Sequence, residues 1–174
     1  MMKCSKFLAG LTLAIVALAT PFMPQVRAQS LTDYGENKSV DTIIRGQTAA
    51  FPATWYVGLD TVACTDAGGG TEVSTSGTGY ARASIAASLA NWAGTQGAGT
   101  TSASTGTGGQ TSNNIAITFP PPTGNWTQVL SFRMWDAASG GNAWFCQTLT
   151  NPKTINSGDA APSFAIGAMT FTFQ

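Results

Sequence analysis

The sequence predicts a mainly β domain, an antiparallel β-sandwich of jelly-roll-like type with one short helix near its N-terminal end. Three observations favour this fold. Apolar and polar residues alternate over short segments, turn-forming clusters of Gly, Pro, Asn and Asp separate these segments, and only one segment carries helix signals. Six or more short strands at this spacing are typical of a sandwich.

The first 28 residues resemble a secretory signal rather than a part of the fold. Two lysines precede an apolar run over 7–19, and a small residue, Ala28, ends the segment. The apolar run is short for a transmembrane span. Met23 offers a second possible start, which would omit this run. We therefore expect residues 1–28 to be absent from the working protein and residues 29–174 to form a single domain.

The helix is predicted over about 32–46. Asp33 and Glu36 are spaced as in a capping box, and Gly46 is a C-terminal stop signal. One side of this segment is apolar, although its spacing is imperfect. Its members are Leu31, Tyr34, Val40, Ile43 and Ile44.

Everything after the helix reads as strands and turns. The strands are expected near 54–62, 79–85, 115–119, 130–135, 143–149, 164–166 and 169–173. A turn over 136–142 joins two of them into a hairpin. The segment 94–112 contains almost only Gly, Thr, Ser, Ala and Gln, which are too poor in large apolar groups to order themselves. We interpret it as a polar loop, with a polar strand paired elsewhere as the alternative.

The composition argues against an enzyme. The chain has no His, which removes the commonest general base and the usual zinc ligand sets. Asp66 and Glu72 flank a run of glycines, and Asp136 and Asp159 are acid–base candidates. Surface turns explain these carboxylates better, because Asp is common there for local hydrogen-bonding reasons. We expect no catalytic residue, no cofactor and no metal.

The charge pattern limits the possible partners. Charged residues make up 9% of the chain, whereas an average soluble protein has about 25%. Beyond the leader, eight acidic and five basic residues leave three net negative charges. A nucleic-acid partner is therefore not expected, nor is a membrane once the leader is removed.

Two tryptophans of the hairpin are the best interface candidates. Trp135 lies on the opposite strand face from Phe132, on the same face as Arg133. Trp144 lies on the opposite face from Phe145. Both indoles are expected to point outward together across the hairpin, with core packing as the alternative. Since few charges keep copies apart, we expect a homo-oligomer that uses this hairpin and the N-terminal helix.

Two cysteines remain when Cys4 is removed with the leader. Cys64 and Cys146 either form one long-range disulfide or stay as free thiols. We expect a disulfide only if the protein is exported, because a cytosolic assembly pathway keeps thiols reduced.

Short motifs of distinctive sequence follow one another along the chain. They are Leu31–Lys38, Arg45-Gly46, Pro52–Leu59, Thr65–Val73, Gly79–Arg82, Asn125-Trp126, Asp136–Asn142 and Asn151–Asp159. In this order they resemble a family of small bacteriophage virion proteins, described as tail fibre or tail-fibre-like structural proteins. The resemblance covers nearly everything after Ser30.

The resemblance implies a compact β domain without chemistry of its own, located in the virion as part of a tail fibre or as a head or tail decoration. The implied partners are further copies of the chain, arranged as a trimer, other virion proteins and a glycan of the host surface. The leader and the expanded 94–112 loop depart from this pattern. The alternative is a secreted or cell-surface adhesion module that binds carbohydrate.

Overall fold

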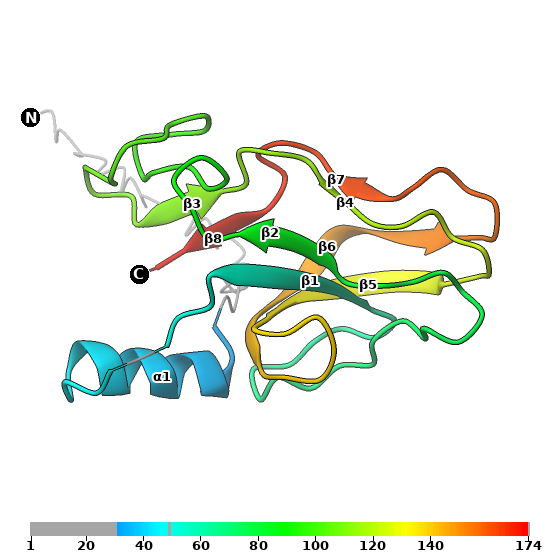
Figure 1. Cartoon of the computed structure of the whole chain (residues 1–174), viewed down its shortest axis with the longest axis horizontal. Helices are drawn as coiled ribbons and strands as arrows, with labels where there is room; N and C mark the ends of the chain where they lie inside the picture. The colour runs from blue at the N-terminus through cyan, green and yellow to red at the C-terminus, as the bar shows by residue number, and fades with distance from the viewer. Residues whose placement is uncertain (1–30, 49, 174) are drawn as a thin grey trace, which may run out of the picture.

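The computed structural model describes residues 31–48 and 50–173, so the predicted leader and Met23 lie outside the described residues. This part of the chain contains one helix and eight strands, whose arrangement is drawn in Figure 1. In chain order they are α1 (Asp33–Ile43), β1 (Thr54–Asp60), β2 (Ala83–Ala86), β3 (Gln110–Ser112), β4 (Ile117–Thr118), β5 (Thr127–Trp135), β6 (Ala143–Ile155), β7 (Ser163–Phe164) and β8 (Thr170–Thr172).

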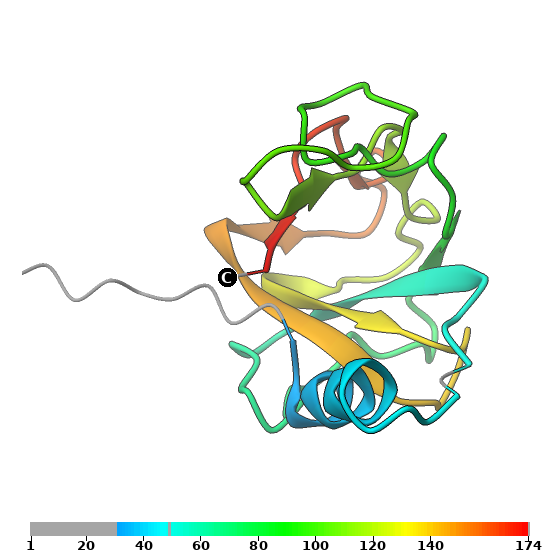
Figure 2. The same ribbon diagram turned by 90° about the vertical axis from the view of Figure 1, so that its left-hand side faces the viewer.

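The strands form two layers. One layer is a four-stranded antiparallel sheet with the order β2-β1-β5-β6, called here the main sheet. The other layer consists of two antiparallel ladders, β3–β8 and β4–β7. Figure 2 shows the main sheet between these ladders and α1, which lies on its far side. The structure thus confirms the predicted mainly β fold of antiparallel sandwich type.

The hydrophobic core fills the space between the two layers. Alternating residues of the main sheet point into it, among them Leu59 and Phe132, both 3% exposed. Rings from the ladders pack edge-to-face on Phe132, with centroid distances of 5.3 Å to Phe164 and 6.2 Å to Phe171. Such pairs add to the stabilisation from buried area alone.

The helix is shorter than its prediction over 32–46. Thr32 is the N-cap in place of Asp33, and its hydroxyl accepts a hydrogen bond from the backbone N–H of Gly35 at 3.3 Å. The helix ends at Ile43, and Gly46 follows with a φ of +66°, which favours glycine as a stop residue. Among the described residues, no helix has the length and apolar character needed to cross a membrane.

The predicted polar loop over 94–112 ends in a paired strand. Its last three residues form β3, which pairs with β8. The Thr111 hydroxyl donates to the carbonyl of Ala93 at 2.7 Å. The predicted loop thus corresponds to residues 94–109, which contain turns and no strand. The alternative, a polar strand paired elsewhere, corresponds to β3.

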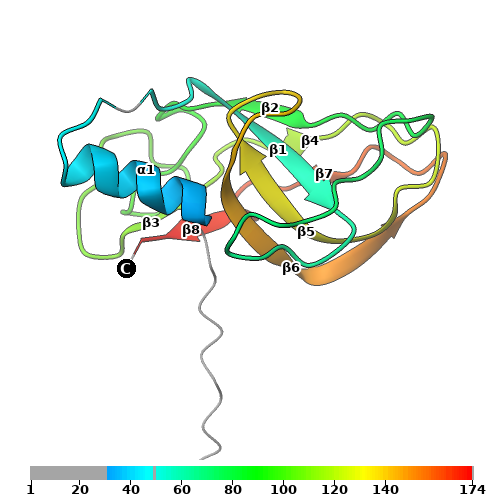
Figure 3. The same cartoon turned by 90° about the horizontal axis from the view of Figure 1, so that it is seen from below.

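The long axis of the molecule separates two structural ends. In Figures 1 and 3, α1 lies at one end of this axis, and the C-terminal part of β6 lies at the other with the chain that leads into β7. Surfaces at these two ends therefore lie on opposite sides of the molecule.

Candidate functional site

Arg133 lies on the face of the main sheet that points away from the ladders, called here the outer face. Its Nε donates to Oδ2 of Asp60 at 2.9 Å, and its Nη1 donates to the carbonyl of Gly68 at 2.8 Å. Arg133 is 6% exposed and Asp60 is completely buried. The prediction that Arg133 belongs to an exposed interface patch is therefore wrong, because its charge is used within the fold.

Two guanidinium groups lie over the indole of Trp135. The guanidinium carbon of Arg82 is 3.8 Å from the ring centroid, and that of Arg133 is 4.4 Å from it. A Cβ atom at Gly58 would lie 2.9 Å from Nε1 of Trp135, so only glycine leaves room for this ring. The half-buried Trp135 is thus part of a cation–π stack on the outer face, in which both arginines contact its ring.

A second ion pair borders this stack. Arg82 donates from Nε and Nη2 to the two carboxylate oxygens of Glu72, each at 2.8 Å. Its Nη1 donates to the carbonyl oxygens of Ala137 and Gly140 in the hairpin turn. The hydroxyl of Tyr80 also donates to Glu72 at 2.9 Å. These contacts connect the hairpin turn to the chain between β1 and β2.

The buried carboxylate of Asp60 and the half-buried carboxylate of Glu72 respond differently to their surroundings. Burial raises the pKa of Asp60 above its ordinary value, although the hydrogen bonds from Arg133 oppose this effect. Burial also acts to raise the pKa of Glu72, but the hydrogen bonds from Arg82 and Tyr80 outweigh it and hold that pKa below its ordinary value. Burial and the neighbouring Glu72 raise the pKa of the Tyr80 hydroxyl, which stays a neutral donor.

Trp144 is buried, in contrast to the prediction that it points outward beside Trp135. The strand register pairs Met134 with Phe145, so regular pairing would place Trp144 opposite Trp135. An irregularity of the ladder pairs Trp135 with Ala143 instead and leaves Trp144 as the extra residue. Trp144 is 3% exposed. The predicted exposed patch of two tryptophans is therefore wrong.

The buried Trp144 supports the N-terminal part of α1. Its ring makes edge contacts with Tyr34 at a centroid distance of 5.3 Å and with Trp55 at 5.6 Å. The backbone N–H of Thr32 donates to its carbonyl at 2.9 Å. A Cβ atom at Gly35 would lie 2.5 Å from the same carbonyl oxygen, so the helix can approach β6 this closely only with glycine there. The first turn of α1 is thereby fixed on the main sheet.

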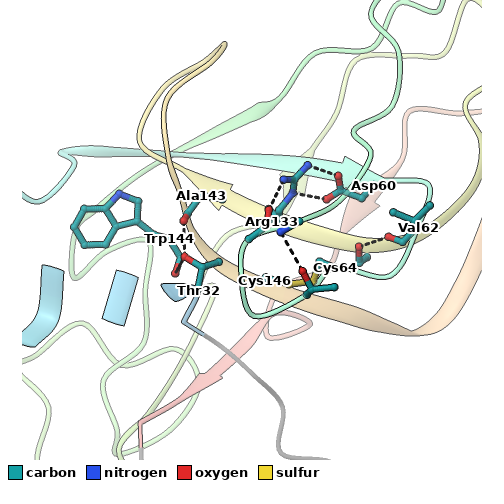
Figure 4. Close-up of a disulfide and its surroundings, with 12 residues drawn as sticks. Thr32, Asp60, Val62, Cys64, Arg133, Ala143, Trp144 and Cys146 are labelled. Carbon is teal, nitrogen blue, oxygen red and sulfur yellow. Dashed lines mark hydrogen bonds and ion pairs between the residues drawn. A yellow bond between two sulfur atoms is a disulfide. The ribbon is translucent and has the colours of Figure 1, made fainter. Parts of the chain in front are cut away.

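A disulfide between Cys64 and Cys146 fastens the loop after β1 to the outer face. Figure 4 shows it near the Arg133–Asp60 pair and the contact between Thr32 and Ala143. The two Cα atoms are 6.0 Å apart, and the sequence separation is 82 residues. In the chain-entropy description a crosslink of this length contributes about 4 kcal/mol to stability.

The carboxylates considered for chemistry do not form a reactive pair. Asp136 follows the end of β5, whereas Asp159 follows the end of β6, which pairs with the beginning of β5. The two therefore lie at opposite ends of the same strand pair. Glu72 is engaged by Arg82, and the described residues include no group of side chains suited to hold a metal ion.

Sequence reasoning did not foresee an exposed apolar cluster at the C-terminal end of α1, called here the helix tip. Its members, with their exposed fractions, are Val40 (51%), Ile43 (76%) and Ile44 (78%). Their spacing of three and four residues places them on one side of the helix. We had grouped them with Tyr34 as one packing side, but only the first turn of α1 rests on Trp144. The remaining apolar surface of the helix is exposed among the described residues.

A comparison with protein families gave one match over nearly the whole described chain. The family model described as Podophage GP4 fiber I protein gp80 matches residues 30–172. The resemblance to phage tail-fibre-like proteins is thereby confirmed. A comparison with curated proteins found no match.

Proposed function

Because the chain belongs to the Podophage GP4 fiber I protein gp80 family, we propose that it is a non-enzymatic structural component of a phage fibre, which assembles with other copies of itself through the helix tip. The family supports a structural role in the virion. The buried arginines of the described residues are paired with carboxylates. These charges therefore stabilise the fold, which is consistent with a role in packing and adhesion.

The exposed helix tip is the observation that carries the assembly proposal. Its three aliphatic side chains are more than half exposed and lie on one side of a helix. The first turn of α1 is fixed by Thr32 and Gly35, so the tip is held in a defined direction. Burying aliphatic surface of this kind in an interface contributes a favourable free energy of about 25 cal/mol per Å².

A second copy of the chain is the occupant that fits this surface best. The only charged side chains of the last turn and its flank, Asp41 and Arg45, already pair with each other at 2.8 Å. A partner therefore meets an apolar surface with no unmatched charge. The same surface on a second copy of the chain is apolar in the same way and so matches it. We propose that three copies meet at their tips around a three-fold axis, the arrangement that the resemblance to tail-fibre proteins implies. Closure of the ring leaves no tip uncovered.

Light scattering on the full chain tests the assembly. Replacing both Ile43→Glu and Ile44→Glu should convert the oligomer into a folded monomer, because like charges would then face each other across the axis. Ile166→Glu is the matched control, since Ile166 is 63% exposed but lies outside α1. A monomeric unmodified chain at high concentration, or an unchanged oligomer in the double variant, would contradict assembly through the tip.

Mass spectrometry of purified phage particles tests the location in the virion. We expect peptides from residues 31–173 in particles at a constant ratio to other fibre proteins. Their absence from particles, with the protein instead in the culture medium, would contradict a virion component.

One observation favours a second candidate, a secreted or cell-surface adhesion module. The Cys64–Cys146 disulfide is typical of oxidising compartments. The intact mass of the native protein separates the two candidates. A chain that starts at Gln29 favours export through a cleaved leader, whereas a start at Met23 favours assembly in the host cytoplasm with later oxidation.

A further inference from the structure

The end of the molecule opposite α1 contains a hollow that the proposed assembly does not use. It lies between the C-terminal part of β6 and residues 159–164, which include β7, and its volume is about 580 Å³. Small-molecule sites typically have volumes of about 300–1,000 Å³. The hollow therefore has the size of a site for a small ligand or for one unit of a larger one.

An irregularity in β6 shapes this hollow. Val129 pairs with Lys153 and Ser131 pairs with Thr148, so four residues of β6 stand opposite the single residue Leu130. The bulged part supplies Leu149 and Asn151 to the lining. Bulges of this kind redirect side chains and are frequent beside binding sites.

The lining combines an apolar wall with polar side chains that have spare hydrogen-bonding capacity. Its half-buried apolar members are Leu149 and Phe164, and its polar members are Asn151, Lys153, Asp159 and Ser163. No described residue forms a hydrogen bond or an ion pair with the side chains of Asn151, Lys153 and Ser163. Oδ2 of Asp159 accepts from the backbone N–H of Asn156 at 2.8 Å, which leaves its other oxygen available.

The polar groups select a ligand by their donor and acceptor pattern. The Lys153 ammonium only donates, the Asp159 carboxylate only accepts, and an amide or hydroxyl does both. A small anion would be attracted by Lys153 but repelled by Asp159, and a cation would meet the reverse. Hydroxyl groups, which donate and accept without net charge, match both side chains at once.

We propose that this hollow binds one neutral saccharide unit. The hydroxyl groups of the sugar would engage Asn151, Lys153 and Asp159, while the C–H face of the ring packs against Phe164. If the protein is a fibre component, as proposed above, the bound saccharide unit belongs to a glycan of the host surface. The site itself does not depend on the proposed function; only this origin of the sugar does. A three-fold assembly joined at the helix tips would present three such hollows away from the axis, and repetition would raise the avidity of a weak site.

NMR titration of the labelled full chain tests the site. The probes are methyl glycosides of glucose, galactose, mannose and their 2-acetamido forms, each at millimolar concentration. At least one should cause saturable shifts confined to residues 149–164. Lys153→Gln and Asp159→Asn should each weaken this binding about tenfold, the usual factor for one hydrogen bond to a charged group. Lys38→Gln on α1 is the matched control and should leave the affinity unchanged.

Three results would overturn the proposal. One is the lack of saturable shifts across the whole panel, and another is tighter binding of acetate, sulfate or an acidic peptide in the same hollow. The third is an affinity that neither Lys153→Gln nor Asp159→Asn changes. These results are independent of the test on phage particles. If the protein is present in particles but gives any of these three results, only the saccharide site is overturned. If the protein binds sugar but is absent from particles, only the fibre assignment is overturned.

Discussion

The inner face of the main sheet, which meets the ladders, and the outer face both contain fully buried residues but carry opposite chemistry. On the inner face Val57 and Leu59 are 0% and 3% exposed, and on the outer face Asp60 and Arg133 are 0% and 6% exposed. The inner face is covered by rings of the second layer. The outer face is covered by α1 and by the loop that carries Cys64.

This difference shows two ways in which one sheet positions its neighbours. Apolar burial is proportional to area and has no direction, so it holds the layers together without fixing each contact. Buried charges are favourable only with their particular partners, so the Asp60–Arg133 pair and the Arg82 contacts fix the loops around them. The outer face thereby gives α1 a rigid base, on which the direction of the helix tip depends.

The largest expected effect comes from a cavity on the inner face. Phe132→Ala should lower the free energy of unfolding by about 4 kcal/mol, because Phe132 is 3% exposed and packs against Phe164 and Phe171. Denaturant unfolding measures the change. Phe173→Ala is the matched control, since Phe173 is 52% exposed, and it should cost under about 1 kcal/mol. Equal losses in the two variants would contradict the assignment of this core.

A somewhat smaller loss is expected on the outer face. Arg133→Met should cost about 3 kcal/mol, because it leaves the carboxylate of Asp60 buried without its partner. Adding Asp60→Leu should restore part of the lost free energy of unfolding, because it removes the unpaired carboxylate. Two apolar residues in contact on the inner face would behave differently, since each truncation there lowers the stability further. The control is Arg45→Met, whose ion pair with Asp41 is exposed and should contribute under about 0.5 kcal/mol. Additive losses in the double variant would contradict the difference between the faces.

The sequence predicted the inner face better than the outer face, and the reason is physical. Alternation of apolar residues is a local pattern, and it predicts inward positions for Phe132, Met169, Phe171 and Phe173. The first three are buried, whereas Phe173, at the end of the described chain, is 52% exposed. The same alternation correctly placed Arg133 and Trp135 on the other face. Whether that face meets solvent depends on distant segments, and no local pattern shows that a loop and a helix cover it.

The errors concern features that break the local repeat. The irregularity that separates Trp144 from Trp135 adds one residue, and the repeat predicts no such insertion. Likewise, β6 was expected to end at 149 because Asn151 and Pro152 are typical of turns, but the strand resumes after its bulge and ends at Ile155. The hollow that depends on this bulge was therefore invisible in the sequence, as was the exposure of the helix tip.

The smallest expected effect is on the pH dependence of stability. We expect the outer face, which contains Glu72, to show this dependence and the inner face to lack it. The pKa of Glu72 lies below its ordinary value of 4.5 in the folded protein, so its contribution to stability is complete above pH 4.5 and is lost as the pH falls through the folded pKa. Asp60 has the opposite sign, because burial raises its pKa. Glu72→Gln should therefore destabilise the protein by about 1 kcal/mol at neutral pH, the usual size for a partly exposed charged hydrogen bond.

The difference between Glu72→Gln and the unmodified protein should shrink as the pH falls below 4.5, because a protonated Glu72 resembles glutamine. Urea unfolding at several pH values measures it. Asp60→Asn in both proteins removes the titration of Asp60, whose pKa the charge of Glu72 helps to raise. In Phe132→Ala the corresponding difference should stay constant with pH, since the lost contacts are with the rings of Phe164 and Phe171, which do not titrate. A pH-independent difference for Glu72→Gln would mean that the Glu72–Arg82 pair contributes only packing, and the outer face would then be stabilised in the same way as the inner one.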